Sequence, residues 1–259
     1  MSSSEFNNNF GGQSPAPVDV LRQFARKRAM RPPEEQCELC STEIGSNHRH
    51  LMDLTKHALL CVCSPCSILF GEPGSGGGNY RLVPDRYLLL MDFHMTDEQW
   101  DNLMIPVNMV YIFNTSWRAQ ESLPQTPSPQ KRAMAFYPSP AGAMESMLSL
   151  EGWDELLSDN PILNSLEPDV EALLINRVQN KGGGADYREH YIVPIDTCFE
   201  LVGLIRLKWQ GLSGGEEVWK AIAEFFVGLR AKATTVGGTE PEKITPTPWR
   251  GEVNARPEL

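Results

Sequence analysis

The apolar pattern divides the chain into a short cysteine-bearing region and a longer body. Two brief apolar runs, 51–54 and 58–62, predict a pair of short strands near the cysteines. Further along, strand-like runs lie at 87–91, 107–113, 133–137, 144–148 and 187–193. Helical patterns lie at 96–103, 152–157, 195–209 and 213–231. The run 169–178 fits either a strand or a helix. Hairpins outnumber strand–helix–strand units, so we expect an α+β fold: a zinc-ribbon-like module, then a mostly antiparallel sheet with C-terminal helices.

Composition changes along the chain predict five segments. Residues 1–17 are rich in Ser, Asn, Gly and Pro, which is typical of a disordered arm, and 237–259 have the composition of a flexible tail. Residues 18–36 form a basic helix or linker that is either a docking patch for an acidic partner or a solvated helix face. Residues 37–73 form the predicted zinc-ribbon-like module with four cysteine ligands, and 79–236 the α+β domain.

Charge and length limit the classes of function. The 259 residues include 23 basic and 33 acidic side chains, for a net charge of −10. Such a balance disfavours nucleic-acid binding, which depends on Lys and Arg at the phosphates. No uncharged apolar run approaches the roughly 20 residues of a membrane helix. No export signal precedes the cysteines, so we expect no transmembrane segment and a cytoplasmic location.

Five of the six cysteines lie between residues 37 and 66, and four of them form two C-x2-C pairs. Two such pairs supply a tetrahedral S4 shell that suits Zn2+, so we predict a structural zinc on Cys37, Cys40, Cys63 and Cys66. Iron in the same shell would instead make a rubredoxin-like carrier. Cys61 also permits an iron–sulfur cluster or another ligand set, and His50 could replace one cysteine.

Catalytic candidates are weak in the sequence. Ser213 lies in a G-x-S-x-G string, but no histidine follows it, so we interpret it as a helix cap completed by Glu216. The pairs Asp92–His94 and Glu189–His190 could transfer protons, yet lack a nucleophile or metal partner, and surface or core-edge roles fit them better. Cys198 fits a buried, inert position. We therefore predict no catalytic residues, although an enzyme whose site forms only in three dimensions stays open.

Several strings resemble an uncharacterised bacterial family encoded beside uptake [NiFe] hydrogenase genes. They are the span 37–66, YRLVPDRY at 80–87, AFYP at 135–138, LEPDVE at 166–171, VPID at 193–196 and the stretch 201–215. The resemblance implies an accessory or maturation protein whose partners are hydrogenase subunits or maturation factors. An electron-transfer protein acting with the hydrogenase is the alternative.

Overall fold

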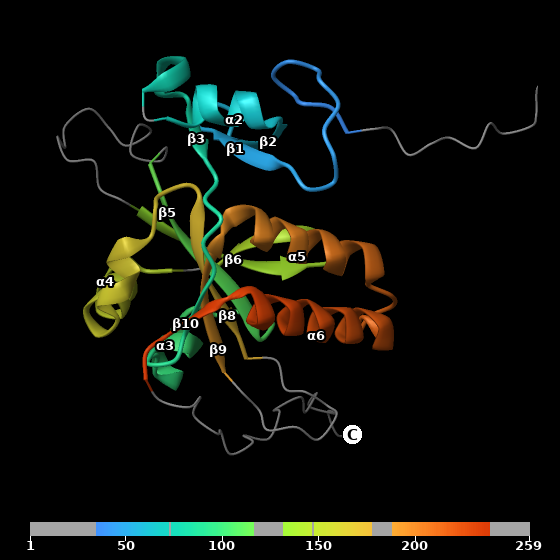
Figure 1. Cartoon of the computed structure of the whole chain (residues 1–259). Coiled ribbons are helices and arrows are strands. Elements are labelled where there is room, and N and C mark those ends of the chain that lie inside the picture. The colour runs from blue at the N-terminus through green and yellow to red at the C-terminus, as the bar shows by residue number, and fades with distance from the viewer. Residues whose placement is uncertain (1–34, 73, 117–131, 147, 178–187, 239–259) are drawn as a thin grey trace, which may run out of the picture.

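A computed structural model describes residues 35–72, 74–116, 132–146, 148–177 and 188–238. They form a small three-stranded module and a larger body built on a seven-stranded sheet (Figure 1). The arm predicted at 1–17, the basic segment up to residue 34 and the tail from residue 239 lie outside the described residues.

The small module is a hairpin with a helix after it and a third strand beside it. Strands β1 (Arg49–Asp53) and β2 (Ala58–Val62) pair antiparallel, as the two apolar runs predict. Helix α2 (Ser64–Gly71) follows, then the 3-10 turn η1 (Ser75–Gly78) and β3 (Tyr80–Leu82), which pairs with β1. The small sheet therefore contains residues from both sides of the glycine-rich segment.

The body is a mixed but mainly antiparallel sheet in the order β10-β4-β9-β8-β5-β6-β7. Only the edge pair β10–β4 is parallel among the described strands. The strands are β4 (Leu88–Leu90), β5 (Met109–Thr115), β6 (Arg132–Ser139), β7 (Gly142–Ser146), β8 (Glu171–Asn176), β9 (Glu189–Pro194) and β10 (Thr234–Val236).

Helices cover both faces of this sheet (Figure 1). One face packs on α5 (Ile195–Lys208) and α6 (Gly215–Lys232), and the other on α3 (Asp97–Asn102), α4 (Leu150–Asp159) and the 3-10 turn η3 (Pro161–Ser165). Side chains of a strand alternate between faces. Accordingly Tyr111 and Leu174 face the α5–α6 layer, whereas Ile112 and Leu173 face α3 and α4. The central strands are thus buried on both faces.

This architecture confirms the predicted α+β class with its antiparallel body and C-terminal helices. The ambiguous run 169–178 contains the strand β8, because both of its faces meet a packed layer. Thr96 and Gln99 form a capping box at α3. The predicted cap at Ser213 is wrong: α6 starts one residue after Gly214, whose φ of 88° is left-handed and favours glycine, and no side chain caps it.

Two arginines are anchored in the body: Arg81 lies in β3 of the module, and Arg86 lies between β3 and β4. Arg81 donates from Nη1 to the Pro168 carbonyl at 2.6 Å and to Asp169 Oδ2 at 3.0 Å. Arg86 binds both carboxylate oxygens of Glu171, Nε to Oε1 at 2.7 Å and Nη2 to Oε2 at 2.5 Å. Both carboxylates are buried, so their charge depends on these partners.

Apolar contacts and one further polar contact join the module to the same side of the body. Met52 from β1 and Val83 lie in the core layer formed with α5 and α6. His50 donates from Nδ1 to Asp196 Oδ2, in the first turn of α5, at 2.8 Å. The module is therefore joined to the body through a packed interface.

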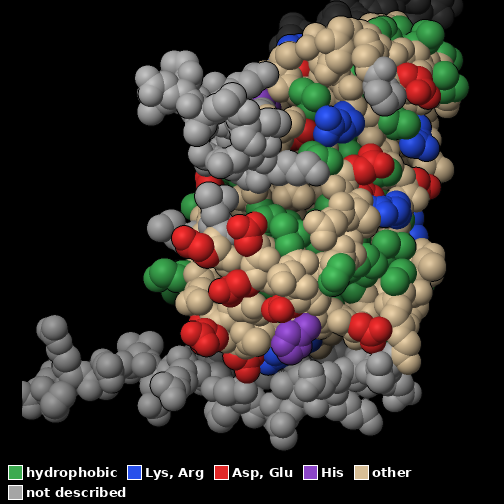
Figure 2. Space-filling view, turned by 90° about the vertical axis from the view of Figure 1, so that its left-hand side faces the viewer, with side chains coloured by type: hydrophobic (Ala, Val, Ile, Leu, Met, Phe, Trp, Pro, Cys, Tyr) green, Lys and Arg blue, Asp and Glu red, His purple; other side chains and the backbone are tan. Residues whose placement is uncertain are grey.

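The face of the sheet that α3 and α4 cover is acidic. Figure 2 looks onto the side of α3 and α4, where red carboxylate side chains gather. The exposed acids of these two helices are Asp97, Glu98, Asp101, Glu151, Asp154, Glu155 and Asp159. A cluster of negative charge of this kind repels phosphate backbones.

The arginine anchors give a test of stability. Arg86→Ala leaves the Glu171 carboxylate buried without its cation, and we expect it to lower the free energy of unfolding by about 3 kcal/mol. The matched control is Lys220→Ala, which breaks an exposed pair with Glu224 and should change stability by less than about 0.5 kcal/mol. Urea unfolding of both variants measures the difference; equal effects would contradict the anchor role.

Candidate metal centre

Four thiols converge at one point of the module. The Sγ atoms of Cys37, Cys40, Cys63 and Cys66 all lie within 4.8 Å of one another, and Cys40 and Cys63 are 3.6 Å apart. The first pair lies on a tight turn before β1. The second pair lies at the start of α2: Cys63 is its N-cap residue, and Cys66 lies in its first turn.

Local hydrogen bonds form the first turn and hold it against the hairpin. The Cys37 amide donates to the Thr42 carbonyl and the Ser41 amide to the Cys37 carbonyl, at 2.8 and 2.7 Å. The Glu38 amide donates to the Cys61 carbonyl at 2.9 Å, and the Cys61 amide donates to Glu38 Oε2 at 2.6 Å. These bonds bring Cys37 and Cys40 next to the end of β2, where Cys63 follows.

The thiols have different tendencies to ionise. Burial opposes ionisation of Cys37, but hydrogen bonds from the backbone of Cys63, Cys40 and Leu39 prevail and lower its pKa to about 6. Burial and the neighbouring thiols raise the pKa of Cys66. Four crowded sulfurs cannot all become anionic unless a cation compensates them, so full deprotonation of this cluster requires a metal ion.

The donor set suits a tetrahedral, closed site. Four thiolates are the ligands of structural zinc and of mononuclear iron, and complete the coordination of either ion. Cys37 and Cys66 are buried against the Leu51 and Val62 side chains, whereas Cys40 is exposed. With all four positions taken by protein, the ion could organise the fold but could not bind a substrate directly.

Cys61 and His50 meet in a second group. They are direct cross-strand partners of β2 and β1, and one ligand atom each from His48, His50 and Cys61 lies within 4.8 Å of the others. The sequence predicts Cys61 and His50 only as alternate ligands at the S4 site, and His48 as a loop residue or a neighbour of the ligands. His48 lies just before β1 and two residues from His50, and this H-x-H spacing was the signal in the sequence.

The catalytic candidates have different surroundings in the structure. Ser213 is exposed, and its carbonyl accepts a hydrogen bond from Trp219 Nε1. Glu189 is buried and bound by Arg230, and His190 is buried in a stack on Phe93. The core-edge interpretation therefore holds for the Glu189–His190 pair. Asp92 and His94 are exposed.

Cys198 is fully buried on α5, as the sequence analysis predicts. Burial raises its pKa well above the ordinary thiol value, and the Asp196 carboxylate adds to this shift. A neutral thiol in this position packs as a small apolar side chain.

The fold and the cysteine cluster define an α+β protein with a candidate metal module. Residues 36–233 match a family of unknown function, DUF5947, and the chain belongs to this family. Searches among curated proteins and among solved structures give no match. Among the residues that the structure describes, no helix is long and apolar enough to cross a membrane.

The S4 cluster predicts a requirement for Cys37. Cys37→Ser removes the thiol that ionises most readily, and we expect loss of the bound ion together with loss of cooperative unfolding or of solubility. Metal content by mass spectrometry and a thermal melt measure this. Cys198→Ala is the matched control, because Cys198 lies in the body core and its loss should leave the metal content unchanged. An unchanged melt for Cys37→Ser would contradict a structural metal.

The buried His190 should make the free energy of unfolding sensitive to acid. Burial, with Arg177 and Arg188 nearby, lowers its pKa from 6.5 to about 3. Below pH 6.5 the unfolded chain therefore binds a proton that the folded chain rejects, and stability falls as pH falls toward 3. Relative to His190→Gln, the wild type should lose about 1 kcal/mol more between pH 6.5 and 5.5. Urea titrations at both pH values test this; parallel losses would refute it.

Proposed function

We propose that this chain is a zinc-stabilised accessory protein that binds a protein partner, and that it assists assembly or maturation of a [NiFe] hydrogenase. The observation that carries the accessory role is the S4 cluster, in which protein thiols supply all four ligands. An ion whose coordination is completed by protein ligands stabilises a recognition surface rather than performing chemistry. The hydrogenase partner rests on the resemblance of the quoted strings to the hydrogenase-linked family.

The surface of the module supports binding to another protein. Helix α2 carries Cys66 on its buried side and exposes Ile68 and Leu69, at 70% and 66% of their full surface. Adjacent exposed aliphatic side chains next to an ordered metal site favour contact with a partner. The ion would fix the orientation of α2 and thus of these two side chains.

An electron-transfer function is the alternative, because iron fits the same four thiolates. Cys40 is exposed, so one ligand of such an iron would reach the surface. Anaerobic purification followed by an absorption spectrum and metal analysis separates the two functions. We expect a colourless protein that contains zinc, whereas a red or brown protein with stoichiometric iron would favour the carrier.

The partner hypothesis predicts a specific effect of the α2 surface. The double variant Ile68→Glu, Leu69→Glu should retain its metal and fold, because both side chains are exposed, but should lose co-purification with hydrogenase subunits or maturation factors. Leu212→Glu is the matched control, since Leu212 is fully exposed on the α5–α6 connection, on a different element. Equal recovery of those proteins by both variants would contradict the proposed surface, and failure of the wild type to recover any would contradict the partner.

A further inference from the structure

We infer that His48, His50 and Cys61 form a second metal site, separate from the S4 cluster, that binds a divalent transition ion through three protein ligands. His50 and Cys61 lie on the paired strands β1 and β2, and His48 lies just before β1. His50 and Cys61 are register partners, and the two imidazole centroids are 4.9 Å apart. The three ligand atoms already lie within 4.8 Å of one another.

Strand alternation separates this site from the S4 cluster. Leu51 and Val62 point to the side of the hairpin that packs with Cys37 and Cys66. Their neighbours His50 and Cys61 therefore point to the other side, which faces the body. Two ligand groups on opposite faces of one hairpin constitute two sites.

The hydrogen bonds of the histidines leave the correct nitrogens for a metal. His50 donates from Nδ1 to the Asp196 carboxylate, and His48 donates from Nδ1 to the Gly45 carbonyl, each at 2.8 Å. In a neutral imidazole, the proton on Nδ1 places the lone pair on Nε2. A carboxylate or carbonyl behind the imidazole is the usual outer partner of a metal-binding histidine, because it fixes the tautomer and the ring orientation.

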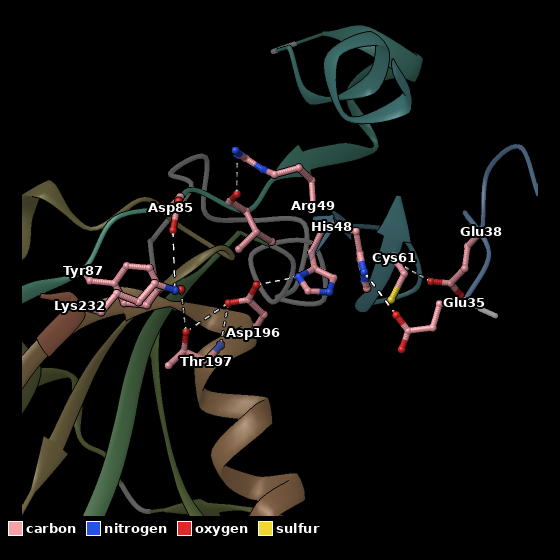
Figure 3. Close-up of polar contacts among 12 residues, drawn as sticks. Glu35, Glu38, His48, Arg49, Cys61, Asp85, Tyr87, Asp196, Thr197 and Lys232 are labelled. Atoms are coloured by element: carbon pink, nitrogen blue, oxygen red, sulfur yellow. Dashed lines mark hydrogen bonds and ion pairs between the residues drawn. The ribbon is translucent and has the colours of Figure 1, made fainter. Parts of the chain in front are cut away.

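His48 Nε2 gives an independent indication of a ligand. This atom is buried and has no hydrogen-bond partner, and the whole side chain is only 10% exposed. A buried polar atom without a partner is costly, and a metal ion within this group would satisfy it. Figure 3 shows His48 next to Cys61, with Asp196 on the body side and Glu35 and Glu38 on the other.

The donor set indicates the class of ion. Two imidazoles and one thiolate suit Zn2+ and ions of similar softness, whereas Mg2+ and Ca2+ require oxygen ligands. Three protein ligands leave a fourth tetrahedral position open. This ion should therefore exchange more readily than the one in the closed S4 site and should accept an external ligand. The second metal site does not depend on which protein the chain assists.

Cobalt titration of the full chain tests the second site. Chelator-treated wild-type protein, titrated anaerobically with Co2+, should bind two ions per chain, and the ion at the open site should show weaker sulfur-to-cobalt absorption because it has one thiolate instead of four. Cys61→Ser and His50→Gln should each bind one ion fewer while they retain the strong S4 spectrum. His94→Gln, an exposed histidine of the body, is the matched control and should bind as the wild type does.

Asp196→Asn supplies a graded test, because it retains all three ligands and weakens only the outer partner. It should keep two ions per chain but bind the exchangeable one at least about tenfold more weakly.

One ion per wild-type chain, or unchanged binding by Cys61→Ser, would overturn the second site. A Cys61→Ser protein whose S4 spectrum changes would also overturn it, since Cys61 would then be a ligand of the first ion. Metal binding at the S4 site and co-purification of the partner can be measured on the same variants. The second site can therefore fail while the S4 site and the partner hold, and the reverse.

Discussion

Charge compensation between two arginines, Arg81 of β3 and Arg86 shortly after it, and two buried carboxylates of the body is the interaction on which the arrangement of the molecule depends. Asp169 and Glu171 are 2% and 0% exposed, and an isolated charge at such a depth would strongly destabilise the fold. Arg81 and Arg86 extend from the module side to bind them. The Ser116 amide and hydroxyl donate to Asp169, and the Glu167 amide donates to Glu171. These groups satisfy one another and hold the module against the body.

The contact between module and body also involves the start of α5. Asp196 accepts the Thr197 amide at 2.7 Å through Oδ1 and the His50 imidazole through Oδ2. A residue of the helix start therefore also orients a histidine of the module. The S4 cluster holds one face of the small hairpin, and the body meets the other. Order in the metal module is thus physically linked to order in the sheet domain.

The sequence predicted much of this fold because its apolar runs are strongly patterned. The hairpin β1–β2, the helix α3 after Thr96 and the two C-terminal helices follow from local rules. The cap at Ser213 failed because the left-handed Gly214 completes the turn without a side-chain bond. The run containing β8 was ambiguous, since a strand buried on both faces lacks alternation.

The candidate site was only partly predictable for a similar reason. Spacing identifies the four cysteines of the S4 cluster, because each pair is local. The grouping of His48 with Cys61 depends on the hairpin register, and the contact of His50 with Asp196 joins residues 146 positions apart. The strings YRLVPDRY, LEPDVE and VPID supply Arg81, Arg86, Asp169, Glu171 and Asp196, and their shared role at the interface is visible only in three dimensions.

Hydrogen–deuterium exchange of the full chain, with its metal and after chelation, tests the linkage between metal module and body most directly. Removal of metal should increase exchange throughout residues 36–82 and also in the body segments 166–171 and 194–197, which contact the module. The amides of β5, which pairs with the central strand β8, serve as the internal reference and should remain protected. Increased exchange confined to the module, with 166–171 and 194–197 unchanged, would contradict the account.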